Sequence, residues 1–94
     1  MKPSHPVLSD PDAVLVLRAL VACGTDAPTD AVAERLGRLP APPPPGAAAA
    51  WLRRLAEAGM AAYRSGPPDP AGGWLPRTLH SATPRGRAAV AGAR

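Results

Sequence analysis

Apolar residues recur at helical spacing within residues 46–63. The apolar stripe consists of Ala48, Leu52 and Leu55, with Trp51 beside them. This spacing predicts a helix with one buried face. Gly59 follows the stripe at the position where a left-handed residue commonly ends a helix. Residues 60–63 then have the pattern of a short strand.

A second apolar pattern covers about residues 11–23 and follows a capping aspartate, either Asp10 or Asp12. The predicted core face of this helix consists of Val14, Leu17, Leu20 and Val21. Leu15 and Val16 add apolar surface on other faces. Because a helix that is apolar on several sides needs cover on more than one of them, the pattern favours a homodimer contact here. Burial within a single chain is the alternative.

Residues 29–37 predict another helix, after a turn at residues 25–28. Thr29 suits its N-cap and Gly37 suits its end. The residues expected to face inward are Val32, Ala33 and Leu36. Residues 38–45 are rich in proline, which forbids helix and favours extended backbone. We expect a stiff spacer here, rather than a polyproline ligand for another protein.

Residues 60–82 predict a β-hairpin. A strand at residues 60–64 and a returning strand within residues 74–82 flank a loop rich in glycine and proline. Since proline cannot donate to a strand ladder, Pro76 predicts that the returning strand lies at an edge or contains a bulge.

The last predicted helix starts with Thr83 as N-cap and Pro84 as first helical residue. The residues expected to pack it against the core are Ala88, Ala89 and Val90. At the other end, residues 1–9 have no periodic pattern and predict a flexible arm. The expected organisation is therefore one domain over residues 10–94 preceded by that arm.

The charge of the 94-residue chain is uneven. Its formal net charge is +4, of which residues 1–50 carry −1 and residues 51–94 carry +5. A high-GC coding background explains the choice of arginine over lysine, but it does not explain this asymmetry. A basic half of this kind suits a polyanion or an acidic partner surface.

Several classes of protein are disfavoured by the sequence. The chain has no apolar run of about 18 residues and no signal-peptide pattern, so the expected location is cytoplasmic. The single Cys23 excludes an internal disulfide and suits a buried thiol. The chain shows no catalytic constellation, so we expect neither enzyme activity nor a bound cofactor or metal. His80 is interpreted as a surface residue rather than a metal ligand.

Three segments carry a resemblance to a known family. Residues 29–37, TDAVAERLG, residues 52–60, LRRLAEAGM, and residues 82–88, ATPRGRA, resemble winged helix-turn-helix regulators of the MarR-like and PadR-like groups. The resemblance spans about residues 10–91. It implies a mainly α fold with a small β-hairpin, in which a three-helix core is followed by a wing and a C-terminal helix.

The resemblance also implies binding of duplex DNA as a dimer, with the third helix in the major groove and the wing at the minor groove or backbone. By matching positions, the DNA-binding residues would be Ala47, Ala50, Arg53, Arg54, Arg64, Arg77 and His80, with Gly46 and Ala49 also facing the groove. The start of this helix departs from the family pattern, because residues 46–50 offer no side chain that reads base edges.

Two functions therefore remain open. The first is a small DNA-binding regulator whose specificity comes from Arg53, the wing or DNA shape. The second is a winged-helix module that recognises a protein or peptide, which the alanine-rich helix start and the proline segment favour. A fold does not by itself decide between these functions.

Overall fold

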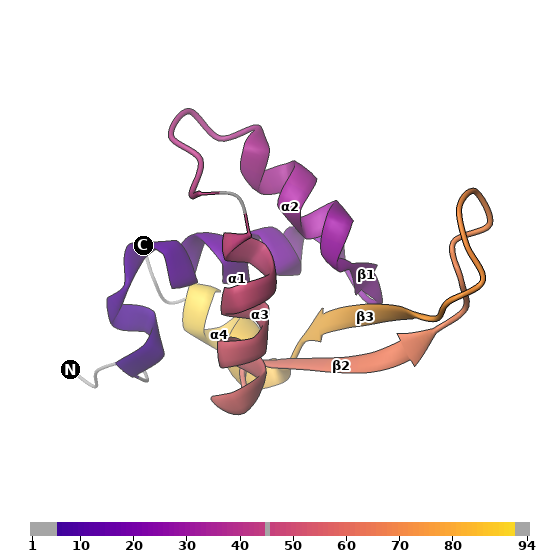
Figure 1. The fold of residues 1–94 in the computed structure, drawn as a ribbon. Coiled ribbons are helices and arrows are strands. Elements are labelled where there is room, and N and C mark those ends of the chain that lie inside the picture. The colour runs from indigo at the N-terminus through magenta and orange to yellow at the C-terminus, as the bar shows by residue number, and fades with distance from the viewer. Residues whose placement is uncertain (1–5, 45, 92–94) are drawn as a thin grey trace.

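Helices form one end of the molecule, and a long hairpin projects from them (Figure 1). The computed structural model describes residues 6–44 and 46–91. In chain order the elements are η1 (Pro6–Ser9), α1 (Pro11–Cys23), β1 (Ala27–Pro28), α2 (Thr29–Gly37), α3 (Ala47–Glu57), β2 (Ala61–Gly66), β3 (Arg77–Ala82) and α4 (Pro84–Ala91). The principal extents are 47 × 27 × 18 Å.

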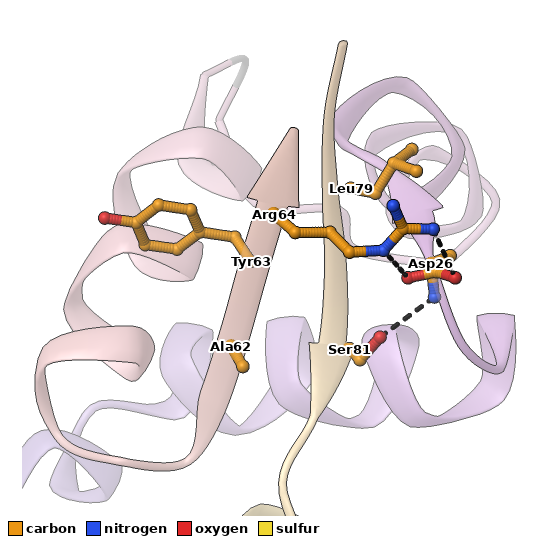
Figure 2. Close-up of a pocket in the computed structure, with 6 residues that line it drawn as sticks. All are labelled: Asp26, Ala62, Tyr63, Arg64, Leu79 and Ser81. Atoms are coloured by element: carbon orange, nitrogen blue, oxygen red, sulfur yellow. Dashed lines mark hydrogen bonds and ion pairs between the residues drawn. The ribbon is translucent and has the colours of Figure 1, made fainter. Parts of the chain in front are cut away.

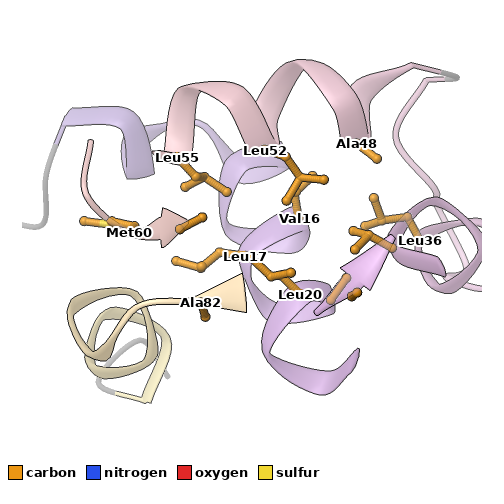
Figure 3. Packing of buried hydrophobic residues seen from close by; sticks show 13 residues of the cluster. Val16, Leu17, Leu20, Leu36, Ala48, Leu52, Leu55, Met60 and Ala82 are labelled. Atoms are coloured by element: carbon orange, nitrogen blue, oxygen red, sulfur yellow. The ribbon is translucent and has the colours of Figure 1, made fainter. Parts of the chain in front are cut away.

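The hydrophobic core lies where α1, α2 and α3 meet the base of the sheet. Its largest fully buried side chains are Val16, Leu17, Leu20, Val32, Leu52 and Leu55. Figure 3 shows Leu52 and Leu55 directed from α3 toward α1. Full burial of a side chain of this size contributes about 1.5–3 kcal/mol. The predicted apolar stripe of α3 is therefore confirmed, since Ala48 is buried as well.

The predicted core face of α1 is confirmed for Leu17 and Leu20, which are fully buried, and is wrong in leaving out Val16. Val16 is fully buried, whereas Val14 and Val21 are half-buried. The reason is that α1 is covered on several sides at once, by α2, α3, β3, α4 and η1. Burial within the chain therefore accounts for much of its apolar surface.

The structure describes residues 6–9 of the predicted arm, and these are helical. Pro6–Ser9 forms the short 3-10 helix η1, and its Val7 and Leu8 pack against the core cluster. Asp10 then caps α1, because its side chain accepts a hydrogen bond of 2.9 Å from the Asp12 amide. Residues 1–5 lie outside the described part of the chain.

The start of α2 differs from the prediction. Pro28 takes the N-cap position without a side-chain cap bond, and Thr29 is the first helical residue. The Thr29 hydroxyl is instead hydrogen-bonded to His80 at 2.9 Å. Ala33, expected to face inward, is exposed. Gly37 is the last helical residue, as predicted, but it does not adopt a positive φ.

Segment 38–44 connects α2 to α3, and residues 42–44 have no regular secondary structure. The last proline of the predicted spacer, Pro45, lies outside the described residues. Gly46 then takes the N-cap position of α3 with φ 85°, and no side chain caps this helix.

The end of α3 confirms the role predicted for Gly59. This residue has φ 80°. Its amide donates to the Ala56 carbonyl at 3.0 Å, and the Met60 amide donates to the Leu55 carbonyl at 2.9 Å. These two bonds form a Schellman motif, in which a left-handed glycine satisfies the last carbonyls of a helix.

The sheet has the strand order β1-β3-β2, and both pairings are antiparallel. Two predictions are wrong here. The expected turn at residues 25–28 contains β1, which pairs Ala27 with His80. The strand β3 is central rather than at an edge. Pro76 does not prevent this, because β3 starts just after it and all its residues keep their amides for the ladder.

The start of α4 confirms the predicted cap. The Thr83 hydroxyl donates to the Gly59 carbonyl at 2.7 Å and accepts from the Gly86 amide at 3.1 Å. One side chain thus caps α4 and ties it to the end of α3. Ala89 and Val90 pack against the core as expected, whereas Ala88 is exposed.

The described helices, hairpin and C-terminal helix confirm the predicted fold class, a winged helix-turn-helix. No helix within residues 6–44 and 46–91 is long and apolar enough to cross a membrane.

Candidate nucleic-acid interface

The outer face of α3 divides into a bare half and a charged half. Its exposed residues are Ala49, Ala50, Arg53, Arg54 and Glu57, while Ala47 is half-buried. The first turn and a half therefore presents only methyl groups. Since base edges are read by polar side chains and methyl groups can touch thymine alone, the arginines carry most of what this helix can offer to a nucleic acid.

The two arginines of α3 have different surroundings. Arg54 lies over the Trp51 ring, with its guanidinium carbon 5.0 Å from the ring centroid. Arg53 makes no ion pair or hydrogen bond with any other residue of the described chain. Arg53 is thus a cation available for a partner.

Arg53 lies at a hollow of about 220 Å³ between α3, the start of α2 and the sheet. We call it the wing-root hollow. It is lined by Thr29, Ala49, Arg53, Tyr63, Thr78 and His80. Tyr63 and Thr78 lie on the same face of the hairpin, because Tyr63 pairs with His80 and side chains alternate along β3. The hollow therefore combines one arginine with three hydroxyl groups.

Arg64 lies on the other face of the sheet. Figure 2 shows Tyr63 and Arg64 extending from β2 in opposite directions. The Arg64 guanidinium binds the Asp26 carboxylate through two hydrogen bonds, Nε to Oδ1 at 3.0 Å and Nη2 to Oδ2 at 2.9 Å. This hydrogen bonding holds the pKa of Asp26 below its ordinary value. The Asp26 amide in turn donates to Ser81 at 2.9 Å. Arg64 therefore fastens the turn before β1 to the hairpin.

Arg77 is on the Arg64 side as well. It pairs with Gly66, which shares the face of Arg64. Its Nε donates to the Pro67 carbonyl at 3.3 Å, so the side chain is directed at the wing loop. The arginines predicted to act together are therefore divided, with Arg53 on one face of the sheet and Arg64 and Arg77 on the other.

His80 does not lie on the surface, contrary to the prediction. It is only 7% exposed. Its Nε2 shares the hydrogen bond with Thr29, while its Nδ1 is buried without a partner among the described residues. Burial lowers the pKa of His80, because the interior disfavours the charged imidazolium. His80 is therefore neutral at pH 7 and forms part of the wall of the hollow.

The stability of the protein should fall as the solution becomes acidic. The unfolded chain binds a proton to His80 near pH 6.5, whereas the folded chain binds it only at lower pH. Below pH 6.5 the unfolded state therefore holds more protons, which lowers the free energy of unfolding. Urea unfolding at about pH 7.5 and about pH 5.5 measures this effect. The variant His80→Gln should show a smaller difference, and an equal difference in both proteins would contradict the assignment.

The sequence reasoning missed three residues of the hollow, Thr29, Tyr63 and Thr78. The alternation of side chains along a strand gives a signal for one of them, since it places Tyr63 opposite to Arg64. The hairpin register was needed to bring Thr78 beside it. The contact of Thr29 with the sheet depends on β1, which has only two residues and no apolar pattern.

Comparison with known proteins gives a likeness of fold. No protein-family model and no curated protein matches the sequence. Among solved structures, the chain is similar to the "PadR-like Transcription factor from bacteroid fragilis". The TM-score is 0.63 and the sequence identity 16%, over 86% of this chain and 77% of that chain. At this identity, the likeness establishes that the chain has the fold of a winged-helix protein.

Proposed function

We propose that this chain is a small winged-helix transcriptional regulator that binds duplex DNA through α3 and the wing. The observation that carries the proposal is the position of Arg53 beside the wing-root hollow, where it is exposed and forms no ion pair with another described residue. The net charge of +5 on residues 51–94 supports it. The similar structure is described as a transcription factor, which adds support from the fold.

The expected mode of binding is mainly to the DNA backbone. Ala47 and Ala50 bring α3 close to the groove without reading bases, and Arg53 supplies a phosphate contact. Arg54 and Glu57 are the other exposed polar residues of α3 that could read a base edge. Arg64 and Arg77 keep a smaller role at the flank of the wing, because both are already engaged within the protein. Such an interface derives its affinity from counterion release and its specificity from DNA shape.

A fluorescence-anisotropy titration of a labelled duplex tests this function. At about 50 mM salt the protein should bind, and at about 200 mM salt the binding should be much weaker, with log K falling by about 0.9 per phosphate contact for each unit of log salt. Absence of binding at the lower salt concentration would overturn the proposal.

Recognition of a protein is a second candidate, and the wing tip favours it. Trp74 is 84% exposed and Leu75 is 67% exposed. Large apolar side chains that are exposed together often mark an interaction site. Recovery of one stoichiometric protein in a pull-down that is insensitive to nuclease would support this candidate. Loss of that protein from a Trp74→Ser variant would assign the contact to the wing tip.

A homodimer through α1 remains part of the proposal. Val14, Leu15 and Val21 are half-buried and leave some apolar surface on this helix. A mass measurement in solution tests it, and a mass equal to one chain would remove the dimer.

A further inference from the structure

We propose that the wing-root hollow is a binding site for a single phosphoryl group, held by Arg53 together with the hydroxyl groups of Tyr63 and Thr78. The inference that this phosphoryl group belongs to the DNA backbone rests on the proposed function. The inference that the hollow binds a phosphoryl group of any source depends only on the residues of the hollow. Its volume of about 220 Å³ accommodates such a group with its hydrating water.

The donors of the hollow come from four elements. Arg53 comes from α3, Tyr63 and Thr78 come from the two strands of the wing, and Thr29 begins α2. Arginine and hydroxyl groups are typical partners of phosphate oxygens in nucleic-acid complexes. Tyr63 is 65% exposed, so its hydroxyl can reach a ligand without being drawn out of the core. The side chains of Arg53, Tyr63 and Thr78 form no hydrogen bond with any other residue of the described chain.

The start of α2 adds a favourable field. No side chain caps this nine-residue helix. The N–H groups of a first helical turn carry a partial positive charge that favours anions. Thr29 is the first residue of α2 and lines the hollow, so this helix end lies at the wall of the hollow. The Asp30 carboxylate in the same turn offsets part of this field. The helix end is therefore a minor addition to the side-chain donors, which define the site.

The charge of its lining distinguishes this hollow from three others on the molecule. The hollow at the turn before β1 contains Asp26, the hollow beneath α2 contains Asp26 and Glu34, and the hollow at the wing tip contains Asp30 and Asp69. The lining of the wing-root hollow contains an arginine and no carboxylate. Arginines line the other three hollows as well, but carboxylates offset their charge there. No carboxylate in the lining of the wing-root hollow offsets Arg53, which favours an anion here.

The wall of the hollow contains an unsatisfied polar group. His80 is 93% buried, and its Nδ1 has no partner among the described residues. His80 also fixes Thr29 through its Nε2, so the α2 end of the hollow is held in place before any ligand arrives.

An NMR titration of the full chain with two probes tests the site. The first probe is inorganic phosphate, compared with chloride at equal ionic strength, and the second is a short DNA duplex. Both should shift the amide signals of Thr29 and Thr78 and the Nε signal of Arg53. The Arg53→Gln variant should weaken both titrations about tenfold, and Tyr63→Phe should weaken them severalfold, because each removes hydrogen bonds to a charged ligand. Arg87→Gln, which removes the same charge at an exposed position of α4, is the matched control and should change them less than twofold.

The outcomes separate the site from the proposed function. If the duplex binds without shifting the signals of the hollow, the phosphoryl site is wrong and DNA binding stands. If phosphate shifts these signals and the duplex does not bind, the site holds a free anion and the DNA-binding proposal falls. If neither probe shifts them, the site is wrong. Equal losses in Arg53→Gln and Arg87→Gln would also overturn it, since they would indicate attraction by net charge alone.

Discussion

Replacement of Gly86 by alanine is expected to lower the free energy of unfolding by about 2 kcal/mol or more. Gly86 lies in the first turn of α4, next to the cap residue Thr83, which is hydrogen-bonded to Gly59 just after α3. A Cβ atom at Gly86 would collide with the Met60 carbonyl and would lie 3.3 Å from a methyl group of Leu17. Because the Met60 carbonyl is a backbone atom and accepts from the Thr83 amide at 3.1 Å, it cannot rotate away.

Urea unfolding or a thermal melt measures the loss, which corresponds to a fall in melting temperature of about 4–8 °C per kcal/mol for a domain of this size. Gly37→Ala is the matched control. Nothing lies within 4 Å of a Cβ atom at Gly37, and this residue ends α2 without a positive φ. This variant should be neutral or slightly more stable than the wild type. A Gly86→Ala variant as stable as Gly37→Ala would contradict the close contact between α4 and Met60.

Replacement of Arg53 by alanine should reduce the affinity for duplex DNA about tenfold at low salt, whereas replacement of Arg64 should reduce it less than twofold. Both changes remove one positive charge. Arg53 is free to contact a phosphate, and Arg64 already binds Asp26 on the opposite face of the sheet. Loss of one phosphate contact also lowers the salt slope by about 0.9.

Anisotropy titrations of both variants over a series of salt concentrations measure these effects. Unfolding of each variant by urea serves as the control, because loss of the pair between Arg64 and Asp26 can change stability without touching the DNA surface. A larger loss of DNA affinity in Arg64→Ala than in Arg53→Ala would show that the DNA lies on the Asp26 side of the sheet.

Features with local causes could be predicted from the sequence. The apolar stripe of α3 depends on helical spacing alone. Gly59 and Thr83 act within a few residues of their own positions, so their capping roles were predicted correctly. Thr83 also binds the Gly59 carbonyl, which joins two of the three segments that carry the resemblance.

Features with distant causes could not be predicted in this way. β1 has only two residues and forms because β3 lies beside it, so the sequence contains no hydrophobic periodicity that predicts this strand. His80 is buried because β1 and Thr29 cover it. The division of the arginines between two faces follows from the hairpin register, and a strand shifted by one residue would reverse it. The chain therefore carries clear signals for its fold and weaker ones for the composition of its site.

Photo-crosslinking from two positions tests most directly whether DNA meets the α3 face of this molecule. A benzophenone side chain at Ala50 stands on the exposed face of α3, and the same group at Ala88 stands on α4, an exposed position on a helix that packs against α1 and β3. The account predicts that Ala50 crosslinks to a labelled duplex at low salt and that Ala88 does not. Crosslinking from Ala88 without crosslinking from Ala50 would contradict it.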